Sequence, residues 1–237
     1  MKINHKIGLH FIVRNATNDD VDKILALDNK VWKDFPADRE MIASRINVFP
    51  EGNLVAVYKS EIVGYLCLQF NDYDLEKHPP FTWNEITDKG TLIKTHDMQG
   101  QFMYGAAMTV APEVQNFGIG TRLIFAGWSL IVKYDKRGCM IGSRIPGYSS
   151  VKDKYTPEDY IKLQREDGKL FDPELRLYKS DGFTIISVLP NYEPDPESCD
   201  YGVLVYQANP FYNRGCLGLR KLIAFIIAKW GHKILGV

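Results

Sequence analysis

The stretch that decides the fold is Met108–Leu123, which reads MTVAPEVQNFGIGTRL. Its apolar first part is typical of a strand, and Pro112 ends that strand. A loop containing Gly118 and Gly120 leads at once into an amphipathic pattern that predicts a helix over 119–134. The first N–H groups of a helix have no partner within it, and the helix dipole adds positive potential there. Because the two glycines let a bulky anion approach the backbone, the stretch predicts a pyrophosphate site.

The spacing of the loop residues separates several kinds of phosphate loop. No Lys-Ser/Thr pair follows the glycines, which excludes a Walker A loop. Leu123 stands where a dinucleotide-binding fingerprint needs its third glycine. A glycine-rich turn that only caps a helix is the plain alternative. The pattern Gln-x-x-Gly-x-Gly over 115–120, after a strand that ends in Val-x-Pro, resembles the acyl-CoA loop of the GNAT superfamily of N-acetyltransferases.

The order of elements along the chain agrees with this resemblance. It reads β-α-α-β-β, insertion, β-α-β, insertion, α-β-β, which predicts an α/β chain with one mixed sheet. The expected strands cover 10–14, 53–70 (a hairpin), 101–110, 138–142, 183–189 and 201–207. The expected helices cover 17–31, 38–48, 119–134 and 173–180. The resemblance implies a GNAT fold, whose central sheet is splayed between its fourth and fifth strands and flanked by helices.

One acetyltransferase domain is expected over 1–207. It contains two irregular insertions, at about 71–100 and 145–172, and segments of this length within a compact domain are usually functional or mobile. A helix start is expected in the second insertion, at Thr156. The tail over 208–237 is apolar and basic, and a helix is expected there. It is too short to span a bilayer, so it packs on its own domain or on a second subunit, or lies on a membrane surface.

The resemblance also implies how the cofactor binds. The pantetheine arm would lie along the fourth strand and bond its backbone, and the pyrophosphate would sit on the N–H groups of 116–121. The implied cofactor-binding residues are Met108, Thr109, Val110, Gln115, Asn116, Phe117, Gly118, Ile119, Gly120 and Thr121.

A second motif, LYKSDGF over 177–183, resembles the late helix of the family, which ends in Tyr-x-x-x-Gly-Phe. Tyr178 falls where many members carry a tyrosine beside the CoA sulfur. The resemblance therefore implies that Tyr178 is the catalytic proton donor to the departing thiolate, which suits a phenol with a pKa of about 10. A ring packed into the core is the alternative.

The base that takes a proton from the acceptor is not identified. Many relatives use a Glu on the fourth strand, and neither Met108 nor Thr109 supplies a carboxylate. Three candidates lie nearby in the sequence: Glu113, Asp97 and His96. For each, the alternative is a solvated loop residue with no catalytic role. Water is a further alternative.

Three residues of the insertions or their borders are expected to bind the acceptor: Trp83, Arg144 and Tyr148. The two aromatic rings would wall the acceptor site, since variable loops on a fixed scaffold usually set specificity. Arg144 would hold an acidic acceptor or a carboxylate of the insertion. The alternatives are insertion core for the rings and a structural salt bridge for Arg144.

A narrower resemblance rests on three further segments, SRIPGY over 143–148, DPEL over 172–175, and LPNYEPD over 189–195 together with Tyr201-Gly202. They look like a subgroup whose acetyltransferase domain is sometimes fused ahead of a carbon–nitrogen hydrolase domain. About 30 residues follow the last expected strand. We therefore expect no hydrolase activity.

Composition excludes several other functions. Lys+Arg and Asp+Glu are both 29, so the formal net charge is zero, which argues against a nucleic-acid binder. The spacing of the five histidines and four cysteines fits no metal site. No secretion signal is seen and no run is long enough to span a membrane, so we expect a cytoplasmic protein with unpaired cysteines.

Together these features predict an enzyme that moves an acetyl group from acetyl-CoA to an amine by direct attack, without a metal. The acceptor would be a small molecule or a peptide. A catalytically silent acyl-CoA-binding sensor is the main alternative, and a nucleotide-binding module is a weaker one. The sequence does not determine the length of the acyl chain, the identity of the acceptor amine or the oligomeric state, and a homodimer is one option.

Overall fold

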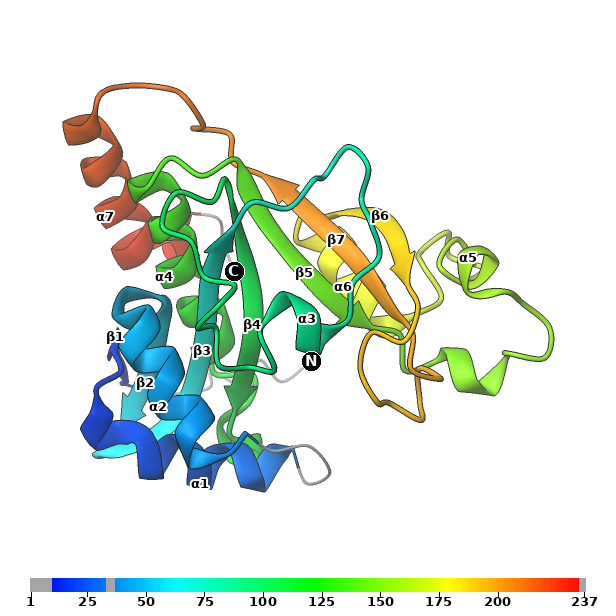
Figure 1. Cartoon of the computed structure of the whole chain (residues 1–237), viewed down its shortest axis with the longest axis horizontal. Coiled ribbons are helices and arrows are strands. Elements are labelled where there is room, and N and C mark those ends of the chain that lie inside the picture. Colours follow the sequence, from blue (N-terminus) through cyan, green and yellow to red (C-terminus); the bar gives the residue numbers. More distant parts are fainter. Residues whose placement is uncertain (1–9, 33–36, 235–237) are drawn as a thin grey trace, which may run out of the picture. The chain divides into compact units, whose positions relative to one another are not determined.

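The computed structural model describes residues 10–32 and 37–234. Within them, seven strands form one sheet in the order β1-β2-β3-β4-β5-β7-β6. The strands are β1 (Ile12–Asn15), β2 (Asn53–Tyr58), β3 (Glu61–Asn71), β4 (Phe102–Val110), β5 (Gly138–Arg144), β6 (Thr184–Leu189) and β7 (Gly202–Ala208). The α-helices are α1 (Val21–Val31), α2 (Arg39–Val48), α3 (Trp83–Ile86), α4 (Ile119–Lys133), α5 (Pro157–Tyr160), α6 (Pro173–Ser180) and α7 (Leu217–Ile234). The predicted mixed α/β architecture is confirmed (Figure 1).

The chain forms two compact units. Unit 1 comprises residues 1–68, 107–133 and 217–237, and unit 2 comprises 69–106 and 134–216. Strands β3 and β4 contribute residues to both units. The expected single acetyltransferase domain over 1–207 stays a prediction.

Unit 1 is built on an antiparallel sheet. Strand β1 pairs with β2, and β2 pairs with β3 through a tight turn. Lys59 and Ser60 both have positive φ (48° and 67°), the conformation that a two-residue hairpin turn requires. Helix α4 packs against β1 and β2, burying Ile119 and Leu123, and α7 packs along α4 (Figure 1). This packing fixes the first turn of α4 relative to the sheet.

Unit 2 is built on β5, β6, β7 and the first part of β4. Strand β4 runs parallel to β5, with Phe102 opposite Gly138 and Tyr104 opposite Met140. Their pairing ends there, although β4 continues to Val110. Strand β5 instead pairs antiparallel with β7 along its whole length. The predicted splay between the fourth and fifth strands is therefore confirmed.

The insertions contain more regular structure than expected. Residues 71–100 include the short helix α3, which begins with a reciprocal capping box between Thr82 and Glu85. The insertion over 145–172 contains α5, whose first turn is capped by the expected Thr156. Both helices have four residues, fewer than a periodic pattern needs to be recognised. In the tail, α7 begins at Leu217.

Candidate functional site

The phosphate loop of unit 1 has the backbone of an anion site. Asn116 and Gly118 both adopt positive φ (66° and 80°) directly before α4. Left-handed residues within a short loop turn successive backbone N–H groups toward one point, where they can bind an anion. A Cβ built on Gly118 would have no atom within 4 Å, so the space before the helix is open. The first turn of α4 carries no acidic residue that would oppose an anion.

The side chains of the loop and the end of β4 differ in exposure. Met108 is 42% exposed, and Gln115, Asn116 and Gly118 are exposed. Val110, Phe117, Gly120 and Thr121 are half-buried, and Ile119 is buried. The amide of Gln115 donates to the Val110 carbonyl at 3.5 Å, a long contact that ties the loop to the strand end. Gln115, Asn116 and Gly118 thus lie at the surface directly before the helix.

Thr109 faces the interior of unit 1. Its hydroxyl donates to Asp28 Oδ1 (3.0 Å) and accepts from the Trp32 indole (3.0 Å). The other oxygen of Asp28 accepts the backbone N–H of Ala37 (2.7 Å). Because its hydroxyl is buried and its one proton is donated to Asp28, Thr109 can offer a cofactor its backbone rather than its side chain.

The three base candidates suggested by the sequence have structural partners. Glu113 forms an ion pair with Lys30 at 2.6 Å, and this hydrogen bond lowers the pKa of its carboxyl. Asp97 accepts the N–H of Gln99, and His96 Nδ1 accepts the N–H of Phe70. Burial lowers the pKa of His96. These contacts make all three part of the local structure.

Tyr178 lies on α6 in unit 2. Asp172 caps this helix by accepting the N–H groups of Glu174 and Leu175, and it also accepts the hydroxyl of Tyr160 (2.8 Å). The Tyr178 ring packs edge-on against Phe183, with ring centroids 5.3 Å apart. Burial is the main cause that raises the pKa of the Tyr178 phenol, with Glu174 adding to it. The phenol therefore keeps its proton at neutral pH and is available as a hydrogen-bond donor.

Tyr104 and Tyr192 form the centre of a buried polar cluster in unit 2. Their hydroxyls are hydrogen-bonded at 2.5 Å, and both phenols interact electrostatically with Glu193 and with the Tyr178 phenol. We call Tyr104, Tyr178, Tyr192 and Glu193 the phenol–glutamate cluster. Burial raises the pKa of Tyr104 and of Tyr192, so these hydroxyls are neutral hydrogen-bonding groups.

The Tyr192 ring fits only because its neighbours lack side chains. A Cβ on Gly142 would lie 2.2 Å from this ring, and a Cβ on Gly202 would lie 2.5 Å from it. Glycines of β5 and β7 thus admit the ring against the sheet. This packing explains the Tyr192 and Gly202 of the sequence motif, and it fixes the backbone that carries Glu193.

Glu193 is the functional candidate that sequence reasoning missed. Its burial raises the pKa of the carboxyl to about 7, with Arg144 lowering it and Asp195 raising it. Its carboxylate accepts no hydrogen bond from the part of the chain that the structure describes. A carboxyl that titrates near neutrality without a fixed partner suits acid–base chemistry. The only local indication was its place in the segment LPNYEPD.

The predicted acceptor residues are held by other parts of unit 2. Arg144 donates to both carboxylate oxygens of Asp195 (2.7 and 2.8 Å) and to Glu197 (2.9 Å). Both carboxylates follow β6 and lie outside the insertion over 145–172. Tyr148 is 5% exposed and packs against Tyr160, within that insertion. Trp83 is half-buried and its indole donates to the Ala106 carbonyl at 2.9 Å.

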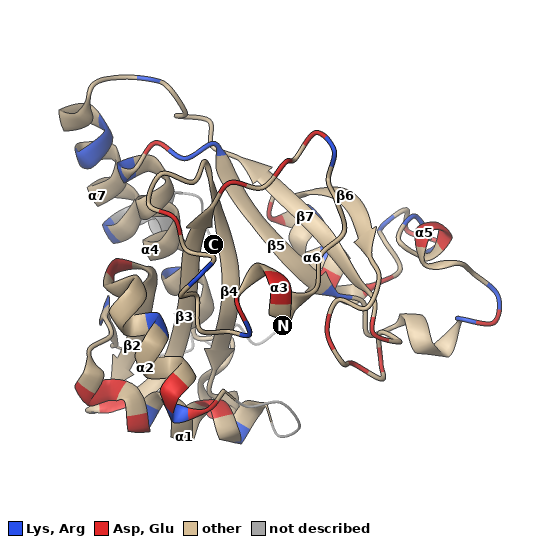
Figure 2. Ribbon diagram, in the orientation of Figure 1, with Lys and Arg blue, Asp and Glu red and all other residues tan. Residues whose placement is uncertain are grey.

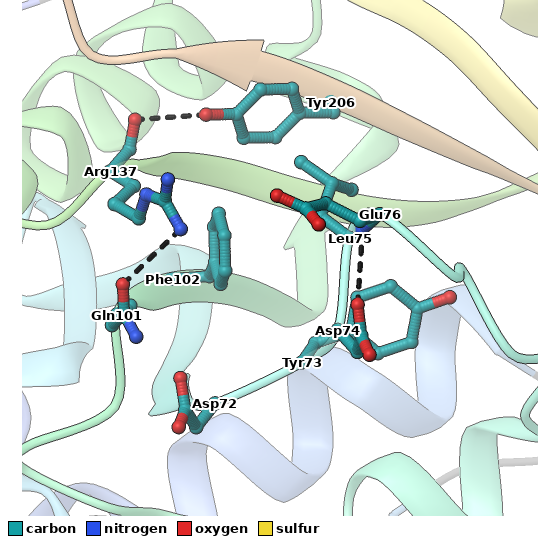
Figure 3. A pocket seen from close by; sticks show the side chains of 9 residues that line it. All are labelled: Asp72, Tyr73, Asp74, Leu75, Glu76, Gln101, Phe102, Arg137 and Tyr206. Carbon is teal, nitrogen blue, oxygen red and sulfur yellow. Dashed lines mark hydrogen bonds between the residues drawn. The ribbon is translucent and has the colours of Figure 1, made fainter.

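Two of the pockets formed by the described residues lie in unit 2. The larger, of about 440 Å³, is lined by Asp72, Tyr73, Asp74, Leu75, Glu76, Gln101, Phe102, Arg137 and Tyr206 (Figure 3). It lies where β4 and β5 begin, whereas ligands of open α/β sheets bind where parallel strands end. The smaller, of about 230 Å³, is lined by Thr82, Asn84, Asn191, Tyr192, Glu193, Pro194 and Asp200. The smaller pocket therefore suits an acceptor better, because Glu193 borders it.

Three further observations concern metal ligands, membrane spans and a buried thiol. The described residues contain no group of three or more His, Cys, Asp or Glu side chains placed to hold a metal. No described helix has the length and apolarity that a bilayer crossing requires. Cys139 is buried, and burial raises the pKa of its thiol to about 12, which makes it a poor nucleophile.

Comparison with known proteins gives one matching family model and several similar proteins. The model described as the acetyltransferase (GNAT) family matches residues 19–139. The probable hydrolase YhcX of Bacillus subtilis (strain 168) is 34% identical over 206 residues. That match covers 85% of this chain but only 39% of YhcX, so the chain spans about two fifths of that relative.

Two further proteins match over nearly their whole length. The uncharacterized N-acetyltransferase YkwB of Bacillus subtilis (strain 168) is 30% identical over 207 residues, covering 85% of this chain and 90% of YkwB. The crystal structure of the loading GNATL domain of CurA from Lyngbya majuscula has a TM-score of 0.69 and 26% identity. It covers 84% of this chain and 98% of that domain.

Proposed function

Because the chain belongs to the GNAT acetyltransferase family, we propose that it transfers an acetyl group from acetyl-CoA to an amine. Family membership makes it an acyl-CoA-dependent acyltransferase. The observation that carries the cofactor assignment is the open loop before α4, with left-handed Asn116 and Gly118. The pyrophosphate would bind the N–H groups of 116–121, and the pantetheine arm would bond the backbone of Met108 and Val110.

Two proton transfers accompany the proposed reaction. The acceptor is an alkylammonium ion at neutral pH, with a pKa of about 10.4 if it resembles lysine. In our proposal the Glu193 carboxylate takes one of its protons, and the neutral amine then attacks the thioester carbonyl. A carboxylate with a pKa of about 7 is a far stronger base than an ordinary glutamate. No acyl–enzyme intermediate is needed.

Tyr178 is proposed to complete the reaction. As the C–S bond breaks, its phenol donates a proton or a hydrogen bond to the departing CoA thiolate. The amine nitrogen loses its second proton as the amide forms, and this proton replaces the one that reaches the sulfur. Burial raises the pKa of this phenol, which keeps it protonated but makes it a weaker acid, so a hydrogen bond to the sulfur is favoured over complete proton transfer. Small-molecule and peptide amines both remain candidate acceptors. The pocket beside Glu193 is the proposed place for the amine, with Trp83, Arg144 and Tyr148 shaping its surroundings.

The four cysteines, Cys67, Cys139, Cys199 and Cys216, form no disulfide in the described part of the chain. This supports a reducing compartment, and we place the reaction in the cytoplasm.

Calorimetric titration tests the cofactor assignment. Acetyl-CoA should bind more tightly than ATP, whereas preference for ATP would favour a nucleotide-binding module. The Gly118→Val variant should weaken acetyl-CoA binding at least tenfold, because a branched side chain opposes the φ of 80° and fills the open space.

The matched control is Gly168→Val. Gly168 also has a positive φ (76°) and no atom within 4 Å of a built Cβ, but it lies in the insertion over 145–172. This variant should lose similar stability and keep its affinity for acetyl-CoA. Equal affinities of the two variants would contradict the assignment of the loop.

A further inference from the structure

Helix α7 exposes an apolar stripe along one face. Leu219, Leu222, Phe225 and Ile226 are 47%, 56%, 59% and 38% exposed. Their spacing of three and four residues places them on the same side of an α-helix. Four large apolar side chains exposed side by side on one helix form a continuous patch, which is uncommon on a protein surface without a partner. We call these four residues the α7 stripe.

The stripe faces away from the rest of unit 1. Ala224, on the opposite side of the helix, is buried, and α7 packs along α4. The guanidinium of Arg122 on α4 donates to the carbonyls of Ala228 and Lys229, at 3.0 and 2.9 Å. The helix is therefore attached through its other face, and the stripe is not a surface that α4 covers.

Positive charge surrounds the stripe. Lys221 and Lys229 are exposed and lie one turn before and after Phe225, and Lys229 Nζ is 5.4 Å from the centre of the Phe225 ring. The sequence from 201 to 237 contains no Asp or Glu. Figure 2 accordingly shows Lys and Arg but no acidic residue along α7. An exposed apolar stripe bordered by lysines is the pattern of helices that lie in a membrane interface.

The positive charge also indicates which partner covers the stripe, a second copy of the chain or a lipid surface. A two-fold dimer through the stripe would bring Lys221 and Lys229 of both copies together, with no acidic side chain on the helix to balance them. A surface with anionic groups above an apolar layer instead complements both the positive charge of the lysines and the apolar stripe. We propose that α7 docks the protein on lipid bilayers that carry anionic headgroups, with the stripe at the acyl boundary.

Vesicle sedimentation of the full chain tests the proposal. The chain should sediment with vesicles of phosphatidylcholine and phosphatidylglycerol, and not with phosphatidylcholine alone. Binding should weaken as salt is raised, because surface charges are screened. The double variant Leu222→Glu/Phe225→Glu should bind more than tenfold more weakly. The charge-reversal variant Lys221→Glu/Lys229→Glu should also bind vesicles more than tenfold more weakly, although its apolar stripe is unchanged.

Ile93→Glu is the matched control, because Ile93 is 63% exposed and lies in unit 2. This variant should bind vesicles like the unmodified chain. Equal binding to neutral vesicles, or unchanged binding in both double variants, would overturn the proposal. So would a dimer in solution that the Leu222→Glu/Phe225→Glu change converts to monomer, because the stripe would then be a contact between copies.

Discussion

Glu193 gives the proposed reaction its pH dependence. Arg144 on β5 and Asp195 on the same loop shift its pKa, and Tyr104 on β4 and the neighbouring Tyr192 both feel its charge. Because the carboxylate must be ionised to act as the base, kcat/KM should rise about tenfold per pH unit below pH 7 and level off above it. In a Glu193→Gln variant, kcat/KM should no longer rise with pH below pH 7 (the acidic limb of the profile). Its rate should fall about 10²–10⁴-fold.

Glu197→Gln is the control for this prediction, since Glu197 is a neighbouring carboxylate bound to Arg144. It should keep the acidic limb. A stability measurement gives independent evidence for the raised pKa. The folded chain holds the Glu193 proton more tightly than the unfolded chain, so this residue's contribution to stability is lost as pH rises from about 5 to 8. Glu193→Gln should escape that loss, and an identical pH profile in both proteins would refute the assignment.

Tyr178→Phe should separate leaving-group chemistry from binding. The ring contact with Phe183 is kept, so the fold should persist while kcat falls about 10–100-fold. A steady-state assay with an acetyl thioester of an acidic aryl thiol should restore much of the rate, since that leaving group needs no proton. If the variant were equally slow with both donors, Tyr178 would not be the proton donor.

At the scale of elements, α6 is held by one buried carboxylate. Asp172 is 1% exposed, caps the helix and also accepts the Tyr160 hydroxyl. Asp172→Ala removes the cap and leaves that hydroxyl unpaired, so we expect a loss of about 2–4 kcal/mol. Thermal unfolding should show a decrease in Tm of roughly 5–15 °C.

Thr156→Ala provides the comparison, because the exposed Thr156 caps the four-residue helix α5. Its loss should cost about 1 kcal/mol or less. Equal Tm values for the two variants would show that Asp172 does not anchor α6.

Helices and turns that are encoded by a local signal, such as a capping residue, an apolar periodicity or a turn sequence, were predictable from the sequence. Helix α6 has the predicted bounds, and α2 begins after the predicted Asp38, which caps it. The hairpin turn at Lys59 and Ser60 was also read correctly. Helix α3 was not predicted, because four residues and a capping box carry too little periodicity.

The candidate site was only partly predictable for a related reason. The phosphate loop is one continuous segment with its own glycines, so its chemistry is visible in the sequence. The raised pKa of Glu193 arises from burial among residues that come from β4, β5 and the loop before β7. No local pattern encodes that burial. Arg144 likewise binds the carboxylates of Asp195 and Glu197, which lie about 50 residues later in the sequence and outside the insertion that follows Arg144.

At the scale of the whole molecule, each unit combines segments that are distant in the sequence. Unit 1 joins residues near both ends of the chain with the segment over 107–133, which contains the phosphate loop. Unit 2 contains the phenol–glutamate cluster and both pockets. Hydrophobic periodicity predicts single elements well, but it does not show which distant elements pack together.

The central claim, transfer of an acetyl group from acetyl-CoA to an amine, is tested most directly by the release of CoA thiol. The assay offers the chain acetyl-CoA with a panel of alkylamines, amino acids and peptides, and it measures the acetylated product alongside the thiol. The account predicts turnover with one class of amine, with one thiol released per acetylated amine. Tight binding of acetyl-CoA with no turnover across the panel would contradict it and would favour a silent acyl-CoA sensor.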